Sequence, residues 1–164
     1  MKSCGIWILF ALVLLSCTPT PHDVQDTTEE LAFYPDYRNV TIPVNIAPLN
    51  FLLRNEQVSA VHVKIQGRND VLEYKSRGRK VIFDLDEWKA FLQKEAGGEL
   101  TITVCTLEDG TWRRYPSFGW TVVEDKIDPY LTYRLIEPGY EVWSRIQIEE
   151  RCVENFEIRT LAHH

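Results

Sequence analysis

Alternating apolar and polar residues recur in short stretches along most of this chain. In Val40–Ile46 every even position is apolar, and in Ser59–Gln66 valine and isoleucine occupy positions 61, 63 and 65. Such alternation is typical of a β-strand with one buried and one exposed face. Pro43 lies on the opposite face of the first stretch and has no N–H group, so we expect that stretch at the edge of a sheet.

Turn residues separate further stretches of this kind. Gly78 lies between apolar residues at 72–74 and 81–83, which predicts a hairpin. Asp109-Gly110 follows the alternating stretch 100–107 and precedes another that begins with Trp, so it predicts a second hairpin.

The last third of the chain continues the pattern with interruptions. Pro116 breaks a strand that resumes over Phe118–Val123, and Pro138-Gly139 predicts a turn between residues 131–135 and 140–148. We expect strands on both sides of that turn, although the apolar spacing in 140–148 also suits a helix.

One stretch changes to helical spacing. Asp84 can cap it, Glu87 follows three residues later, and Gly97-Gly98 can end it. The pattern predicts a helix over about residues 85–96, with apolar residues on one side: Leu85, Trp88, Phe91 and Leu92.

Seven to nine short strands, one helix and turn signals every 8–12 residues predict a mainly β protein with an Ig-like β-sandwich. We expect the sandwich domain at residues 32–126. Residues 127–164 are expected to supply strands that either complete the sandwich or lead into a domain missing from this chain.

The N-terminus has a different pattern. Lys2 precedes ten apolar residues, Ile6–Leu15, which is the length of a signal-peptide core and too short to span a bilayer. The following Ser16-Cys17 resembles the lipobox of bacterial lipoproteins. That resemblance implies removal of residues 1–16, acylation of Cys17 with fatty acids such as palmitate, and attachment to the cell envelope. The alternative is an ordinary secretory signal peptide cleaved elsewhere.

Residue 18 is threonine rather than the aspartate that retains lipoproteins of enteric bacteria in the inner membrane, so the resemblance favours the outer membrane. Two or three acyl chains would hold the protein permanently, because one chain alone gives only marginal binding. Residues 17–31 are polar, with two prolines and four acids but no base, and are expected to form a disordered acidic tether behind the lipidated cysteine.

Charge excludes some partners. The 164 residues carry a net charge of −6, and the N-terminal segment holds one positive charge and no acid, so its removal leaves −7. Such a balance argues against nucleic acid, whose binding needs basic side chains against phosphates. It also argues against a basic surface that binds membranes, so the expected membrane contact is through the acyl chains.

Processing would leave two of the four cysteines, Cys105 and Cys152. They either form a disulfide, which an envelope compartment permits, or remain two buried thiols. Cysteine and histidine spacings typical of metal or haem sites are lacking, so we expect neither a metal nor another cofactor.

Residues able to do acid–base chemistry have simpler structural explanations. The paired acids at 84 and 86, 125 and 128, and 149 and 150 fit helix caps, a turn and a solvated surface. Histidines occur only at positions 22, 62, 163 and 164, and no nucleophile motif or phosphate loop is present. We therefore expect no enzyme activity.

Aromatic residues gather towards the C-terminus and allow two interpretations. They can form a surface that stacks sugar rings or docks a protein, or they can fill the core of a sandwich. The candidate surface residues are Trp112, Trp120, Tyr140 and Trp143.

The stretch Asp128–Trp143, with Arg151 and Phe156, resembles the N-terminal region of large Gram-negative lipoproteins. Those proteins continue into a C-x-x-C-H haem-type motif and a TolB-like β-propeller. Neither follows here, since Cys105 and Cys152 lack the motif. The resemblance therefore implies a truncated or stand-alone version of the leading domain.

The sequence thus predicts a lipid-anchored envelope protein that acts as a non-catalytic interaction or assembly module with a protein or glycan partner. One alternative is a glycan-binding module of a surface lipoprotein. A second is the N-terminal fragment of a larger propeller-containing lipoprotein or enzyme.

Overall fold

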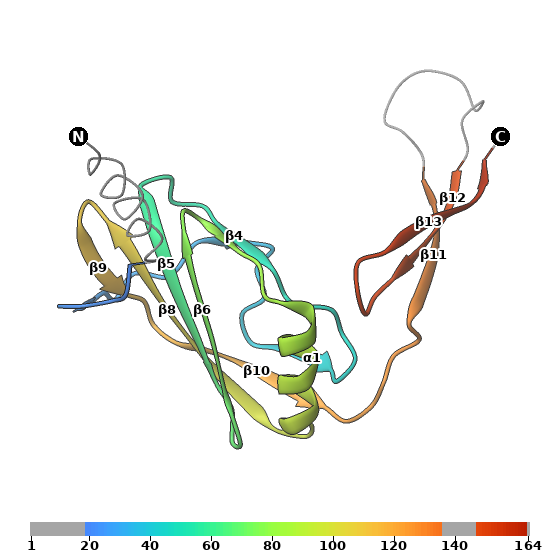
Figure 1. Cartoon of the computed structure of the whole chain (residues 1–164), viewed down its shortest axis with the longest axis horizontal. Helices are drawn as coiled ribbons and strands as arrows, with labels where there is room; N and C mark the ends of the chain where they lie inside the picture. Colours follow the sequence, from blue (N-terminus) through green and yellow to red (C-terminus); the bar gives the residue numbers. More distant parts are fainter. Residues whose placement is uncertain (1–18, 136–146, 164) are drawn as a thin grey trace, which may run out of the picture.

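The computed structural model describes residues 19–135 and 147–163 (Figure 1). Over these residues the chain forms thirteen strands and one helix. In order they are β1 (Gln25–Asp26), β2 (Phe33–Tyr34), β3 (Val40–Pro43), β4 (Phe51–Leu53), β5 (Val58–Gln66), β6 (Val71–Arg77), β7 (Lys80–Val81), α1 (Leu85–Lys94), β8 (Glu99–Glu108), β9 (Thr111–Arg114), β10 (Phe118–Val123), β11 (Tyr130–Leu135), β12 (Gln147–Cys152) and β13 (Ile158–His163).

Strand β8 is the centre of a seven-stranded sheet. One side of β8 pairs with β5, which in turn pairs with β6. The other side of β8 pairs with β10 at its start and with β9 at its end. The expected break at Pro116 is confirmed, because this residue lies between β9 and β10. The Asp109-Gly110 hairpin is confirmed as well, and both residues have positive φ.

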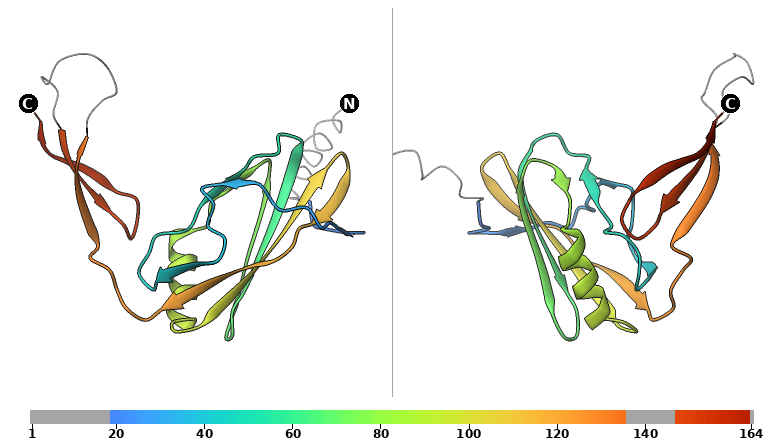
Figure 2. Two further views of the ribbon diagram at one scale, coloured as in Figure 1. Left: turned by 180° about the vertical axis from the view of Figure 1, so that it is seen from behind. Right: turned by 45° about the vertical axis from the view of Figure 1, so that its right-hand side comes forward.

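A smaller sheet, β2-β4-β7, and helix α1 cover the inner face of the seven-stranded sheet (Figure 2). Aromatic rings connect the layers: Phe33 of β2 stacks on Phe118 of β10 with centroids 5.4 Å apart, and Trp88 of α1 meets Trp120 edge-on at 6.0 Å. The expected mainly β, sandwich-like fold is confirmed. Strands outnumber the expected seven to nine because three have only two residues and β4 has only three, too few to show periodicity.

The predicted helix forms where its capping residue places it. The Asp84 carboxylate accepts hydrogen bonds from the N–H groups of Asp86 and Glu87, which satisfies the first turn of α1. Its buried side bears Trp88, and Gly97, with φ +73°, follows the last turn. The helix ends at Lys94, two residues before the expected limit.

Strand β3 is an edge strand, as Pro43 predicts. It pairs only with β10, in parallel, with Ile42 opposite Val122. Proline has no N–H group to donate to a neighbouring strand, so it is tolerated at the last position of an edge strand, where no such bond is needed.

The hairpin expected around Gly78 is wrong. Strand β6 pairs with β5 in the larger sheet, whereas β7 pairs with β4 in the smaller one. Gly78, with φ +82°, donates its N–H to the Ser59 carbonyl at 2.7 Å as the chain passes between sheets. Period-two patterns are the same for a hairpin and for a crossing between sheets, so alternation cannot distinguish them.

The expectation of a disordered tether over residues 17–31 is also wrong for residues 19–31, the part that the structure describes. Strand β1 pairs in parallel with β9, and the Asp26 carboxylate receives two hydrogen bonds from the Arg114 guanidinium, at 2.6 and 3.2 Å. Val24 packs beside Trp112, and Leu31 is buried in the main core. Two apolar residues and an available strand edge order this acidic segment. The expected signal peptide and Cys17 lie outside the described residues.

Candidate interaction site

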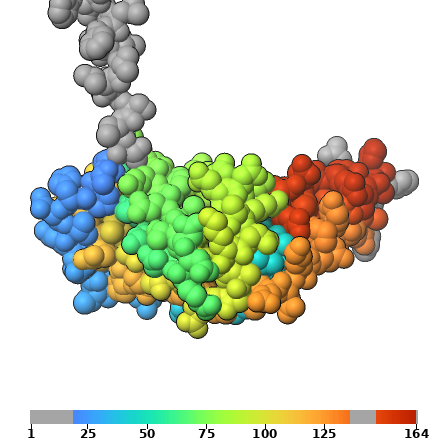
Figure 3. Space-filling view, turned by 60° about the horizontal axis from the view of Figure 1, so that its bottom comes forward, coloured from blue at the N-terminus to red at the C-terminus, as the bar shows by residue number. Residues whose placement is uncertain are grey.

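Strands β11, β12 and β13 form a separate antiparallel sheet. No described strand hydrogen-bonds this C-terminal sheet to the other two sheets. It projects at one end of the molecule, opposite β1 (Figures 1 and 3). The expectation that residues 127–164 complete the sandwich is therefore wrong for these strands.

The C-terminal sheet exposes an unusual amount of apolar surface. Cys152 is the only buried residue in its three strands. Large apolar side chains between 37% and 56% exposed lie on the strands and on the β12–β13 turn. Surfaces of this kind mark interaction sites in soluble domains. The residues are Tyr130, Leu131, Leu135, Ile148, Phe156, Ile158 and Leu161.

Strand register separates these residues into two faces, because directly paired residues point to the same side. Leu131, Arg151 and Ile158 form one row across the three strands. Tyr133 lies on the same face and donates its hydroxyl hydrogen to the Glu149 carboxylate at 2.7 Å, and this bond raises the Tyr133 pKa. We call this face the Leu131 face.

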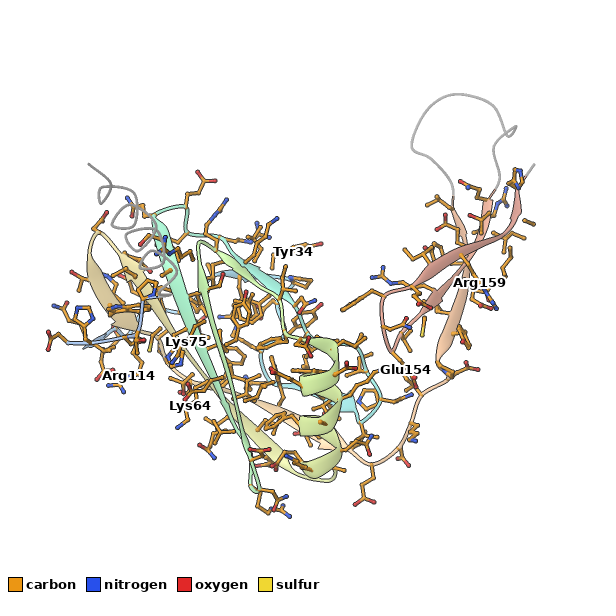
Figure 4. All side chains as sticks on the ribbon, viewed as in Figure 1. Tyr34, Lys64, Lys75, Arg114, Glu154 and Arg159 are labelled. Carbon is orange, nitrogen blue, oxygen red and sulfur yellow. The ribbon has the colours of Figure 1, made fainter. Side chains whose placement is uncertain are left out.

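The opposite face is organised around one arginine. The Arg159 guanidinium lies over the Tyr130 ring, 5.6 Å from its centroid, and pairs with the Glu150 carboxylate at 2.5 Å. Figure 4 labels Arg159 on this sheet and Glu154 between the sheet and the rest of the molecule. Paired charges and exposed apolar groups thus alternate across the sheet, an arrangement suited to protein recognition.

A buried amide holds the C-terminal sheet against the sandwich. Asn45 donates from Nδ2 to the Ile127 carbonyl at 2.9 Å and to Glu154 Oε1 at 2.7 Å, and its Oδ1 accepts from the Ile127 N–H. The Ala47 N–H also donates to the Val153 carbonyl at 2.8 Å. These four bonds fix how the sheet is presented.

Two of the four residues named as a candidate aromatic surface do not lie on the surface. Trp112 and Trp120 are each 1% exposed, so they belong to the interior. Trp120 donates its indole N–H to the Tyr37 carbonyl at 2.6 Å, and Trp112 packs with Ala60 and Cys105. Large rings on alternating positions are buried because they provide most of the apolar area in the core. Tyr140 and Trp143 lie outside the described residues.

The two remaining cysteines are free thiols and both are buried. Cys105 lies on β8 of the large sheet, whereas Cys152 lies on β12 of the C-terminal sheet. Of the two alternatives, a disulfide or two buried thiols, the structure therefore has the buried thiols. Burial raises the pKa of the Cys105 thiol, which makes it a poor nucleophile at neutral pH.

Several of the acids and histidines that could do acid–base chemistry have structural partners instead. Asp84 caps α1, and Asp128 accepts a hydrogen bond from the Tyr130 N–H. His62 lies 3.4 Å from Glu73, and burial lowers the His62 pKa. Within the described ranges, no three His, Cys, Asp or Glu side chains gather closely enough to hold a metal ion.

Sequence reasoning missed both the junction and the third strand of this site. Asn45 occupies a polar position of the alternating stretch Val40–Ile46, so the pattern gave no signal that its side chain would be buried. Strand β13 lacks regular alternation because of a bulge opposite Ile148 and Glu149.

No helix in the described part of the chain is long and apolar enough to cross a bilayer. No family model and no curated protein matches this sequence.

Proposed function

We propose that this protein is a lipid-anchored interaction module of the cell envelope that docks a partner protein through its C-terminal sheet. The observation that carries the proposal is a three-stranded sheet with apolar side chains exposed on both faces and a fixed attachment to the sandwich. Leaving such a surface in water is unfavourable by about 25 cal/mol per Å² of apolar area, which a partner would recover.

The anchor part of the proposal is supported by the sequence alone. Lys2, the ten apolar residues of Ile6–Leu15 and Ser16-Cys17 follow one another as in bacterial lipoprotein signal peptides. The acyl chains would attach the protein to the outer membrane, and the sandwich would then present the sheet. Strand β1 is bound to β9 at the end of the molecule away from that sheet, which keeps the two functions apart.

A metabolic labelling experiment tests the anchor. The chain is expressed in a Gram-negative host that is fed an alkyne analogue of palmitate. We expect the label on the wild-type chain and its loss in Cys17→Ala, with Cys4→Ala as the matched control that keeps it. Label retained by Cys17→Ala would contradict the proposed attachment site.

Photo-crosslinking in the source cell tests the docking surface. A photoreactive residue at Leu131 should give an adduct of one defined mass, whereas the same residue at Thr121, exposed on the large sheet, should not. Ile158→Asp, in the same row as Leu131, should remove the adduct because it places a charge within the apolar face. Equal adducts from Leu131 and Thr121 would contradict the proposal.

A second candidate function uses the same surface. The C-terminal sheet would dock a following domain of one longer polypeptide, as the resemblance of Asp128–Trp143 to leading regions of propeller lipoproteins implies. Sequencing the source DNA beyond the codon for residue 164 tests this candidate. A reading frame that continues into repeating β blades supports it, and an immediate stop codon contradicts it. The glycan-binding alternative loses its basis at Trp112 and Trp120, which are buried.

A further inference from the structure

The strand edges of this protein differ in how well they are protected. An edge strand offers unpaired N–H and C=O groups that can pair with another chain, and proteins usually prevent this with prolines, charges, bulges or very short strands. In the large sheet, β3 ends in Pro43, β1 has two residues, and β6 exposes charged side chains at Glu73 and Lys75. In the small sheet, both edge strands have two residues.

Strand β11 lacks most of these protections, and Arg134 is its one charged residue. It runs for six residues, Tyr-Leu-Thr-Tyr-Arg-Leu, with no proline, glycine, lysine or acid. Its register with β12 has no shift from Tyr130 to Leu135, whereas β13, at the other edge, is interrupted by a bulge. Aromatic and β-branched residues favour the extended conformation that a strand edge needs.

The hydrogen bonds beside β11 identify the backbone groups that are free. The Val153 N–H donates to the Pro129 carbonyl, so the backbone of residue 129 points towards β12. Successive residues alternate in direction, so Leu131, Tyr133 and Leu135 also point towards β12. Tyr130, Thr132 and Arg134 therefore point to the open side. The Tyr130 N–H is already bound by Asp128 Oδ1 at 3.0 Å, which leaves the N–H groups of Thr132 and Arg134.

Charge identifies the kind of strand that fits. Arg134 forms no hydrogen bond or ion pair with any other described residue, whereas Arg159 on the same face is paired with Glu150. An incoming strand with an acid beside Arg134 would pair this cation. A second copy could not provide that acid from β11, because β11 contains none. On the Leu131 face, apolar residues of the incoming strand would lie beside Leu131 and Tyr133.

We propose that the open edge of β11 binds an extended segment of another protein by β-strand addition, with an acidic residue beside Arg134 and apolar residues beside Leu131 and Tyr133. This inference rests on the proposed docking function and specifies how the partner binds. Main-chain hydrogen bonds to Thr132 and Arg134 supply affinity in this mode, and the alternating side chains supply selectivity.

A peptide binding assay on the full chain in detergent tests the edge. The probe is a fluorescein-labelled nine-residue peptide that alternates valine and glutamate, and the control peptide alternates valine and lysine. Anisotropy should show that wild type binds the glutamate peptide about tenfold more tightly, as expected for about 1.4 kcal/mol from one charge-assisted contact. Arg134→Glu should reverse the preference, whereas Lys64→Glu, the same charge change on the exposed side of β5, should leave it unchanged.

Proline substitution tests the backbone contacts. Thr132→Pro removes a free N–H on the open side without removing a bond to β12, and it should weaken binding about tenfold or more. Thr132→Val keeps the N–H and should bind as wild type does. Should Thr132→Pro fail to fold, the Arg134→Glu and Lys64→Glu pair decides the question alone.

Three results of the binding and sedimentation measurements would overturn the proposal. One is no preference of wild type between the peptides, and another is equal binding by Thr132→Pro in its folded form. The third is a wild-type dimer in sedimentation that Thr132→Pro abolishes, because the occupant would then be a second copy. A Leu131 crosslink that depends on Ile158 but ignores Thr132→Pro and Arg134→Glu would overturn the edge mode and leave the proposed docking function standing.

Discussion

The Asn45 side-chain amide donates a hydrogen bond to Glu154 Oε1 at 2.7 Å, across 109 positions of sequence. Asn45 follows β3 at the edge of the sandwich, and Glu154 lies in the turn between β12 and β13. The same amide group contacts both backbone groups of Ile127, where the chain leaves the sandwich. One buried side chain therefore holds the start of the C-terminal sheet and its β12–β13 turn together.

Asn45→Ala should loosen the C-terminal sheet while the sandwich stays folded. It removes three hydrogen bonds, one to a carboxylate, and leaves partly buried groups unpaired, at a cost of about 2 kcal/mol. Hydrogen exchange of β11–β13 should become about thirtyfold faster by the relation between free energy and equilibrium, with β5 and β8 unchanged. Asn55→Ala removes a similar bond in a surface turn and is the control. Unchanged exchange in β11–β13 would show that Asn45 is not the main attachment.

A second buried polar group holds the turn between β5 and β6. The Glu95 carboxylate, 1% exposed, accepts hydrogen bonds from the N–H groups of Arg68, Asn69 and Asp70 at 2.7–2.8 Å. Glu95→Ala should lower the free energy of unfolding by about 3 kcal/mol, because three N–H groups of the β5–β6 turn lose their acceptor. Urea denaturation measures the loss, and Glu99→Ala, an exposed acid on β8, is the control.

Gly67→Ala tests the same site from the opposite side. A Cβ atom at Gly67 would collide with the Glu95 carboxylate, so this substitution should also destabilise the protein. The same change at Gly98, whose nearest neighbour is the Glu95 backbone carbonyl at 3.0 Å, should be milder. Urea midpoints that are equal for the two alanine variants would contradict the close packing at Gly67.

The strands that sequence could predict are those that bury one face locally. Val61, Val63 and Ile65 alternate because β5 has a core on one side and water on the other, and the Asp84 cap depends only on its neighbours along the chain. Features that depend on distant partners left no such signal. Strand β1 is ordered by β9, almost ninety residues away, which the composition of residues 18–31 does not reveal.

The candidate site was hard to predict for the same reason. Alternation in β11 predicts a strand, but it does not say whether the apolar face is covered. Trp120 is covered by the layers above it, whereas Leu131 has no such layer among the described residues, although both lie in alternating stretches. Burial is a property of the assembled layers, so residue type alone could not decide whether Trp112 and Trp120 belong to the core or to a surface.

The two buried cysteines should behave as protected thiols. Alkylation by iodoacetamide at pH 7.5 should be on the order of ten times slower for Cys105 than for a free cysteine, because burial raises its pKa and reduces the thiolate fraction. After unfolding without a reductant, peptide mass spectrometry should find both Cys105 and Cys152 alkylated. A peptide that links the two residues would instead establish a disulfide.

His62 makes stability depend on pH. Burial lowers its pKa in the folded protein, assisted by Lys75 and Lys64 and opposed by Glu73, so the folded state binds a proton less readily than the unfolded state. Stability is therefore complete above the unfolded pKa of about 6.5 and declines as the pH falls below it. Urea midpoints should drop between pH 7.5 and pH 5.0 in wild type and drop less in His62→Gln. Carboxyl groups begin to titrate near the lower end of this window in both proteins, so the difference between wild type and His62→Gln isolates the contribution of His62. Equal slopes in the two proteins would mean that His62 titrates alike in both states and that its burial on β5 has no energetic effect.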